Sequence, residues 1–242
     1  MDENIAFIFI GTNKYIDFFP QYYNSVMEKF TPGIKKHIFA FSDDPAHLAF
    51  EQEGVTPLYA EHKDWPYITL KRFEFIMKAK DELKEFSDVI FMDADMVVDA
   101  TIPDEFLNAY KYYFGVHHPG QYMYGPVCEF ETDPKSTACV TKSINDTQYR
   151  QGCFWGGKNP HILEMIEKLR DNVDKDLENE IIAAWHDESH LNRFFTDNED
   201  KVVTLKAGFA YPEMWKMPME KYIVHKDKNM TEFPRFRGGS DN

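Results

Sequence analysis

Four short apolar runs constrain the fold of this chain more than any other feature. They are IAFIFI (5–10), HIFAF (37–41), VIFM (89–92) and YYFGV (112–116). Continuous apolar runs of this length are typical of strands that are buried on both faces. Apolar residues recur at helical spacing in segments 67–86 and 160–171. Strands that alternate with helices predict an α/β fold with a mainly parallel, Rossmann-like sheet flanked by helices.

The length and the pattern of the chain indicate one domain. A chain of 242 residues with 43% hydrophobic residues suits a single large domain. There is no internal repeat and no linker, and segment 117–152 has the polar, Pro- and Gly-bearing composition of a loop. The glycine-bearing, basic end at 234–242 predicts a mobile tail.

The charge balance excludes two classes of partner. Lys and Arg total 27 against 41 Asp and Glu, which gives a formal charge of −14. An excess of acids opposes binding to nucleic acid and to anionic membrane surfaces. An anionic ligand must therefore be received by a metal ion or by a few well-placed cations.

The cysteines and the hydropathy pattern predict a soluble, cytoplasmic protein. The three cysteines show no CxxC spacing, so neither a disulfide framework nor a cysteine zinc site is expected. The N-terminus is acidic and its apolar run is too short for a signal peptide. No run reaches the ~18–20 apolar residues of a membrane span.

Two aspartates, Asp93 and Asp95, directly follow the third apolar run. On an extended segment, side chains at i and i+2 point the same way, and two like charges repel unless a cation or a shared proton lies between them. Ligands of parallel α/β sheets bind at the carboxyl ends of the strands, where this pair is expected.

Three interpretations of the aspartate pair remain open from these residues. The first is a solvated acidic turn. The second is the nucleophile of an aspartyl-phosphate hydrolase, although the second acidic pair usual in those enzymes is not found downstream. The third is a nucleotide-sugar transferase whose carboxylates hold Mn²⁺ or Mg²⁺ against a diphosphate, because hard oxygen ligands suit these ions.

The segment AWHDESHLN (184–192) favours an active site. His186 and His190 have the spacing of a zinc-protease pair, but Asp187 stands where that motif needs glutamate. A charged helix start, with Asp187 and Glu188 near its positive end, is the simpler alternative. A tryptophan, two acids and two histidines within six residues fit a catalytic segment better.

The motifs FMDADM, HPGQY, FWGG and WHDESHLN resemble block motifs of glycosyltransferase family 6, and their order matches along nearly the whole chain. This family contains the histo-blood-group A and B transferases and the α1,3-galactosyltransferases. The resemblance implies a GT-A fold, a UDP-sugar donor, a glycan acceptor and retention of the anomeric configuration. Both aspartates of the DXD motif are present, which implies dependence on Mn²⁺ or Mg²⁺.

The resemblance also implies roles for individual residues. For the nucleotide and donor sugar, the matching positions are Phe9 and Tyr15 at uracil, Ile68 at the nucleoside, Arg72 and Lys228 at the diphosphate, Asp93 and Asp95 at the metal, Cys153 at the position that selects the sugar, and Asp187 at its hydroxyls. For the acceptor they are His118, Trp185 and His186. Glu188 matches the catalytic carboxylate.

These roles divide the chain into two functional halves and define the expected activity. Residues 1–115, with the DXD motif, are expected to bind mainly the nucleotide, and residues 116–233 mainly the acceptor and the catalytic groups. The expected reaction moves galactose or a related hexose from a UDP-sugar to a glycan in α-1,3-type linkage. A UDP-sugar hydrolase and a non-catalytic sugar-binding relative are the alternatives. The acceptor is not implied, because the family's arginine-bearing acceptor loop and its acceptor-binding acid, here replaced by Pro212, are missing.

Overall fold

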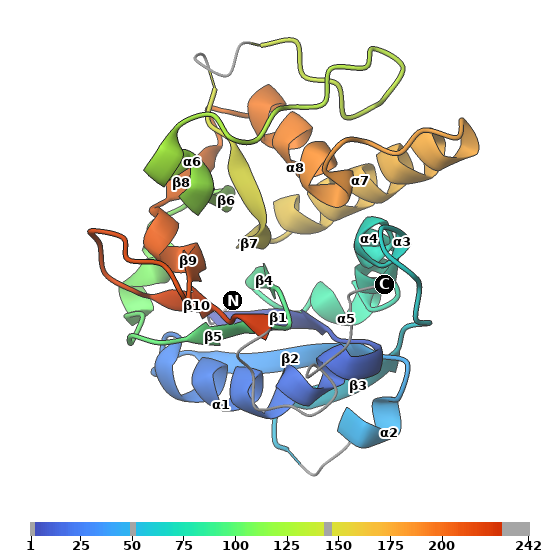
Figure 1. Ribbon diagram of the computed structural model, residues 1–242. Helices are drawn as coiled ribbons and strands as arrows, with labels where there is room; N and C mark the ends of the chain where they lie inside the picture. The colour runs from blue at the N-terminus through green and yellow to red at the C-terminus, as the bar shows by residue number, and fades with distance from the viewer. Residues whose placement is uncertain (1–2, 49–51, 143–146, 229–242) are drawn as a thin grey trace.

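A mixed sheet forms the centre of the structure, a computed structural model that describes residues 3–48, 52–142 and 147–228 (Figure 1). Within these ranges the strand order is β3-β2-β1-β4-β7-β6-β8. The strands are β1 (Asn4–Ile10), β2 (Lys35–Ser42), β3 (Val55–Tyr59), β4 (Asp88–Met92), β6 (Tyr113–His117), β7 (Arg150–Lys158) and β8 (Val202–Leu205). Neighbouring strands are parallel except at β7, which is antiparallel to β4 and β6. The predicted α/β fold with a mainly parallel sheet is confirmed.

All four apolar runs form strands of this sheet. They correspond to β1, β2, β4 and β6 within one or two residues at each end. Alternate residues of β1 enter opposite cores: Phe7 and Phe9 pack on one face, and Ala6 and Ile8 on the other. A strand covered on both sides needs apolar residues at every position, which explains the continuous run.

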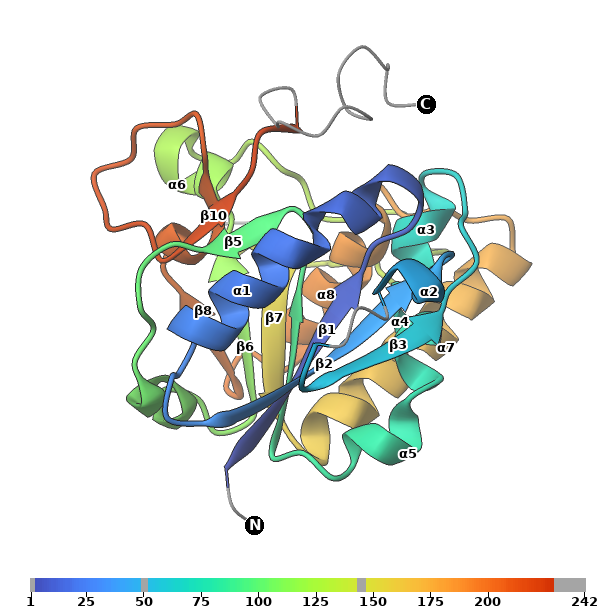
Figure 2. The ribbon, with the colours of Figure 1, turned by 90° about the horizontal axis from the view of Figure 1, so that it is seen from below.

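Helices cover both faces of the sheet (Figure 2). Helix α1 (Phe19–Lys29) lies on one face, where Phe19, Tyr22 and Val26 join the core of Phe7 and Phe9. The other face carries α3 (Tyr67–Leu70), α4 (Arg72–Met77), α5 (Lys80–Leu83), α7 (His161–Glu178) and α8 (His186–Asp197). The shorter elements are α2 (Pro45–Leu48), α6 (Pro119–Tyr124) and 3-10 helices at Asn13–Phe18, Asp104–Asn108 and Ala207–Ala210.

The helical segments differ from the sequence prediction in three places. Segment 67–86 is broken into α3, α4 and α5, and the first break falls at Lys71, directly before Arg72. We attribute this break to the buried contacts of Arg72 described below, because tertiary contacts override local propensity. The helix predicted at 160–171 continues to Glu178, and the segment predicted as a loop at 117–152 contains α6 and the start of β7.

A small second sheet brings the C-terminal part of the described chain to the end of β4. It consists of β5 (Met96–Val98), β10 (Ile223–His225) and β9 (Tyr211–Pro212). Strand β10 is antiparallel to β5, with His225 opposite Met96. His225 is thereby placed beside Asp95, which precedes Met96 in the chain.

The two functional halves expected from the sequence share the central sheet. Strand β4 of the first half pairs with β7 of the second, and the facing residues Phe91 and Trp155 stack with ring centroids 5.1 Å apart. Trp155 is fully buried. The assignment of nucleotide and acceptor binding to 1–115 and 116–233 stays a prediction, and the tail at 234–242 lies outside the described residues.

The β4–β7 junction generates a stability prediction. Trp155→Ala should lower the free energy of unfolding by about 3–5 kcal/mol, because it removes a fully buried ring and leaves a cavity. Urea unfolding measures the loss. Trp185→Ala is the matched control, since Trp185 is 47% exposed and its truncation should cost far less. Equal losses at the two positions would contradict the assigned role of the junction.

Candidate active site

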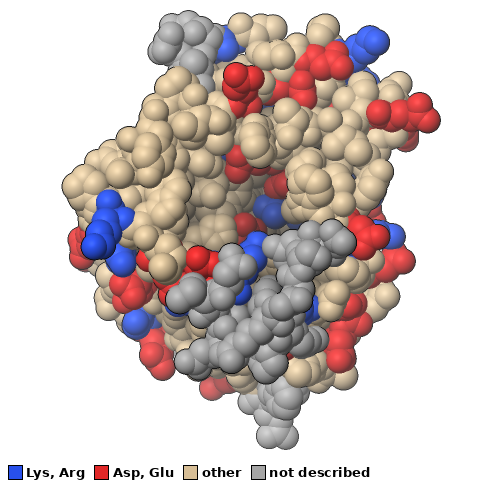
Figure 3. All heavy atoms as spheres, in the orientation of Figure 1, with Lys and Arg blue, Asp and Glu red and all other residues tan. Residues whose placement is uncertain are grey.

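A cavity of about 250 Å³ opens at the carboxyl end of β4. Its lining comes from the start of α4, the end of β4, strand β7 and the start of α8, namely Trp65, Arg72, Asp93, Gln151, Gly152, Cys153, Trp185, His186, Asp187 and Glu188. Figure 3 shows a hollow on this face, with basic and acidic side chains inside it. The structure therefore brings five of the ten predicted donor and catalytic residues to one cavity: Arg72, Asp93, Cys153, Asp187 and Glu188.

Arg72 is the central cation of this cavity. Its guanidinium donates to the carbonyl oxygen of Gly152 at 3.0 Å and forms ion pairs with Asp93 at 3.3 Å and Asp187 at 2.9 Å. The guanidinium carbon lies 4.4 Å from the centroid of the Phe91 ring. Burial lowers the pKa of Arg72, but the carboxylates outweigh this effect and the net shift is upward. Arg72 therefore stays charged and can meet a diphosphate.

Asp93 and Asp95 lie in a tight turn between β4 and β5. The sequence argument placed them on an extended segment, and that geometry is wrong, because the Met96 amide donates to the Asp93 carbonyl at 3.1 Å across the turn. The side chains still converge: Asp93, Asp95 and His225 each offer a ligand atom within 4.8 Å of the others. Two carboxylates and an imidazole at this spacing fit a divalent transition-metal ion.

The two aspartates experience different surroundings. Burial raises the pKa of Asp93 to about 6; Arg72 opposes this effect and the neighbouring Asp95 adds to it. Burial also acts on Asp95, but His225 at 3.1 Å and Lys228 at 3.5 Å outweigh it and lower the pKa of Asp95 to about 2. Asp95 is thus an anion with partners, whereas Asp93 is a carboxylate that a further cation would stabilise.

Glu188 is held rigidly near the start of α8. The hydroxyl of Tyr149 donates to one carboxylate oxygen at 2.6 Å, and the Gly152 amide donates to the other at 2.7 Å. The Asn192 side chain donates to the Glu188 carbonyl at 2.9 Å. Burial raises the pKa of Glu188 to about 7, although both hydrogen bonds to the carboxylate lower it. Two donors on a desolvated carboxylate fix its position for chemistry at an adjacent carbon.

The rim of the cavity contains Trp65, Trp185 and His186. Trp65 and His186 contact each other with ring centroids 4.6 Å apart in an edge-to-face arrangement. Trp65 and Trp185 are 69% and 47% exposed, so both indoles present surface to a ligand. Cys153 is buried in the wall, and its carbonyl accepts from the Asp93 amide at 2.9 Å.

Other residues named from the sequence lie outside the cavity lining. Lys228 lies over the Tyr15 ring, with its Nζ 5.1 Å from the ring centroid, on the far side of Asp95. Phe9 is fully buried and packs against Phe19 and Tyr22, so its ring is part of the hydrophobic core. Its contact with uracil stays a prediction. Ile68 is half-buried at the edge of the second core.

Two histidines named in the sequence analysis, His118 and His190, have structural contacts of their own. His118 caps α6, since its Nδ1 accepts from the amides of Gly120 and Gln121. It packs against Tyr149 with ring centroids 5.9 Å apart, which places it close to Glu188 but outside the cavity lining. His190 is buried beside Asp176 and Thr137, away from His186 at the rim, so the pair does not form a zinc-protease site.

Five site residues were not assigned from the sequence: Trp65, Tyr149, Gln151, Gly152 and His225. His225 stands in the segment HKDKN beside Lys228, and Tyr149 and Gln151 stand in YRQGC beside Cys153. Their neighbours in the chain were the available signal. The partners of His225 and Tyr149 are distant in sequence, so the pairings themselves depend on the fold.

The mainly parallel sheet, with an acidic pair and the buried Arg72 at the carboxyl end of β4, is consistent with a GT-A fold. The model of glycosyltransferase family 6 matches residues 2–225, and the chain belongs to this family. It is 29% identical over 225 residues to the O-antigen biosynthesis glycosyltransferase WbnI of Escherichia coli, covering 93% of this chain and 94% of that protein.

Mammalian members of the family are also similar. The human globoside alpha-1,3-N-acetylgalactosaminyltransferase 1 is 28% identical, with 84% of this chain matching 60% of that protein. The rat histo-blood group ABO system transferase 1 is 26% identical, with 80% of this chain matching 57% of that protein. The chain thus spans nearly all of the bacterial relative and about three-fifths of the mammalian ones. In its described part, no helix has the length and apolar character needed to cross a membrane.

The raised pKa of Glu188 predicts a pH-dependent stability difference. A carboxyl whose pKa is higher in the folded state stabilises the fold below its unfolded pKa, and this contribution disappears as the pH rises through about 7. The melting temperature of the native protein minus that of Glu188→Gln should therefore be larger at pH 5 than at pH 8. Thermal unfolding of both proteins at the two pH values measures it. A difference that grows with pH would contradict the burial effect.

Proposed function

We propose that this protein is a divalent-metal-dependent, retaining glycosyltransferase that moves galactose from UDP-galactose to a glycan acceptor in α-1,3-type linkage. Membership of family 6 supplies the reaction class. The observation that carries the proposal is the convergence of Arg72, Asp93, Asp187 and Glu188 on one cavity. A diphosphate needs cations, and an anomeric carbon needs a nearby carboxylate; this cavity offers both.

The diphosphate end of the donor would lie between Arg72 and the DXD turn. Asp93, Asp95 and His225 fit as ligands of Mn²⁺, since an imidazole beside carboxylates is less suited to Mg²⁺. When bound, such a cation supplies positive charge to the leaving diphosphate. Arg72 and Lys228 would add their charges from opposite sides of the turn.

The sugar end of the donor would lie against Asp187 and Glu188. Asp187 is ion-paired to Arg72 and can accept from sugar hydroxyls with its remaining capacity. Glu188 would either bond to the anomeric carbon or stabilise positive charge there. Both roles need the carboxylate, and Tyr149 and Gly152 support it by lowering its pKa from the value that burial alone would give.

The acceptor would approach across the aromatic rim. Trp185 and His186 form this side of the cavity, and His118 lies behind Tyr149. The experiment that tests the whole proposal measures UDP release from UDP-galactose with and without an array of sugar acceptors. Acceptor-stimulated release with formation of an α-linked product supports it. Release that no acceptor increases indicates a hydrolase, and absence of release indicates a sugar-binding relative.

Metal dependence is the first prediction from this proposal. EDTA should abolish transfer, and Mn²⁺ should restore it. Asp95→Asn should remove most of the activity even with Mn²⁺ present, because it removes a charged ligand. Activity assays with titrated Mn²⁺ and Mg²⁺ measure both effects. Full activity in EDTA would exclude the metal from the mechanism.

Glu188 is tested by a nearly isosteric change. Glu188→Gln should lower kcat by at least about 10²-fold, the scale of losing one key electrostatic group. UDP affinity should barely change, since Arg72, Lys228 and the DXD turn remain. Steady-state kinetics and UDP binding on one variant give both values. Nearly normal turnover with a lowered melting temperature would make Glu188 a structural residue.

Donor choice is tested at Cys153. The buried Cys153 thiol would reduce the space in the sugar site, so an unsubstituted hexose would fit better than one with an acetamido group. Cys153→Gly should raise the use of UDP-N-acetylgalactosamine relative to UDP-galactose. The ratio of kcat/KM for the two donors measures this preference. A native enzyme that already prefers UDP-N-acetylgalactosamine would show that Cys153 does not set the choice.

A further inference from the structure

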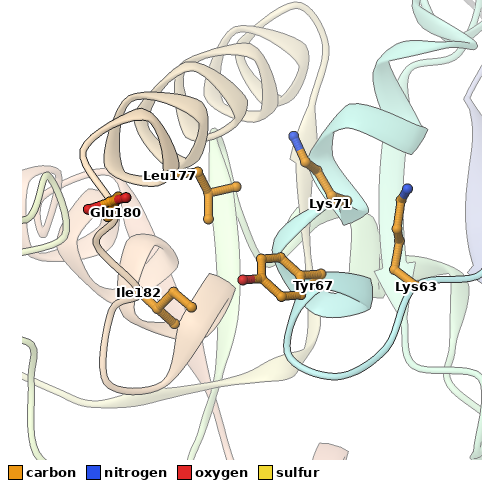
Figure 4. A pocket seen from close by; sticks show the side chains of 6 residues that line it. All are labelled: Lys63, Tyr67, Lys71, Leu177, Glu180 and Ile182. Atoms are coloured by element: carbon orange, nitrogen blue, oxygen red, sulfur yellow. The ribbon is translucent and has the colours of Figure 1, made fainter.

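A second and larger cavity, of about 470 Å³, lies between α3 and the C-terminal end of α7 (Figure 4). It is lined by Lys63, Tyr67, Lys71, Leu177, Glu180 and Ile182. None of these residues belongs to the donor site proposed above. The volume lies within the roughly 300–1,000 Å³ that is usual for small-ligand sites.

Two segments of the chain contribute residues to both cavities. Segment 63–72 contributes Lys63, Tyr67 and Lys71 to the second cavity and Trp65 and Arg72 to the donor cavity. Segment 177–188 is divided in the same way, with its first residues in the second cavity and Trp185 to Glu188 in the donor cavity. The two cavities are therefore formed by different residues of the same two segments.

The lining has the chemistry of a sugar site. Tyr67 is 45% exposed and Ile182 is 44% exposed. Figure 4 shows the Tyr67 ring extending from α3 toward Leu177, in the last turn of α7, and toward Ile182, in the segment that follows it. An exposed aromatic ring offers a flat surface to the C–H face of a pyranose, while the lysine and glutamate ends nearby can bond to its hydroxyls.

The local charges favour a neutral ligand over an anion. Lys71 is ion-paired with Glu74 and Asp174, at 2.9 Å in each case. Lys63 is ion-paired with Glu61, and Glu180 adds another negative charge to the lining. Neither ammonium group is left as an uncompensated charge, so a phosphate would face as much repulsion as attraction.

We infer that this cavity binds a sugar of the glycan acceptor beyond the one that receives the transferred residue. The inference rests on the proposed transferase function. The acceptor is then a neutral oligosaccharide of two or more sugars, whose reducing-side part crosses the Trp65–Trp185 rim. Residues at this cavity select acceptors by length without taking part in donor binding.

The test compares oligosaccharides with their own terminal monosaccharides. Binding of an array of neutral glycans of one to four sugars is measured with UDP and Mn²⁺ present, and transfer from UDP-galactose is measured in parallel. At least one oligosaccharide should bind more tightly than its terminal monosaccharide. Tyr67→Ala should reduce that advantage by about tenfold, the scale of one lost aromatic contact.

Three further variants separate the subsite from folding and donor effects. Ile182→Asp, on an exposed position, should also reduce the advantage, whereas Tyr67→Phe should preserve it. Tyr59→Ala is the matched control, because Tyr59 is 58% exposed on β3 and lines neither cavity. UDP affinity should be unchanged in all four proteins.

The two proposals fail in different ways. If no oligosaccharide binds more tightly than its terminal monosaccharide, or if Tyr67→Ala and Ile182→Asp weaken both equally, the subsite is excluded even when transfer occurs. If no glycan stimulates UDP release, the transferase function fails. Length-dependent binding that the two variants abolish would then still locate a glycan site in this cavity.

Discussion

The buried guanidinium of Arg72 is the interaction on which the rest of the site depends. A buried charge is tolerated only when anions and carbonyl oxygens surround it. Here these partners come from three elements: Asp93 after β4, the Gly152 carbonyl in β7 and Asp187 at the start of α8. One side chain therefore links the end of β4, the neighbouring strand β7 and the start of α8. A polar environment that is fixed before the substrate arrives is what transition-state stabilisation requires.

Strand β10 places His225 beside the turn that contains Asp93 and Asp95. Asp95 has its low pKa because His225 and Lys228 come from this segment, whereas Asp93 lies on the Arg72 side and keeps a raised pKa. The pair is therefore electrostatically asymmetric before any ion binds. A cation held by Asp93, Asp95 and His225 would replace the ion pairs that Asp95 forms with His225 and Lys228, so that ion binding would be coupled to the position of segment 223–228.

The sequence predicted the parts of this site that depend on local pattern. The buried strands are recognisable because both faces of the sheet are covered, and the acidic pair is recognisable because it interrupts an apolar run. The backbone conformation at Asp93 and Asp95 was not predictable, because a turn and an extended segment can both bring side chains at i and i+2 together. His225 was not predictable either: about 130 residues separate it from Asp95, and only the β5–β10 pairing brings the two together. The break at Lys71 depends in the same way on partners of Arg72 that lie elsewhere in the chain.

Strand β7 links the chemistry of the site to its selectivity. The Gly152 amide donates to Glu188 and its carbonyl accepts from Arg72, while the next residue, Cys153, lines the same cavity. A Cβ atom at position 152 would lie 3.2 Å from the Cβ of Glu188 and 3.4 Å from its Oε2, which is close to the limit of van der Waals contact. Glycine therefore permits the close approach that holds the carboxylate. Because Cys153 is also bonded through its carbonyl to the amide of Asp93, a change of side chain at 153 alters the room for the sugar, whereas a change of backbone there would disturb Glu188, Arg72 and Asp93 together. Donor selectivity at this position can therefore vary through the side chain of residue 153, whereas the backbone of β7 has to keep its position.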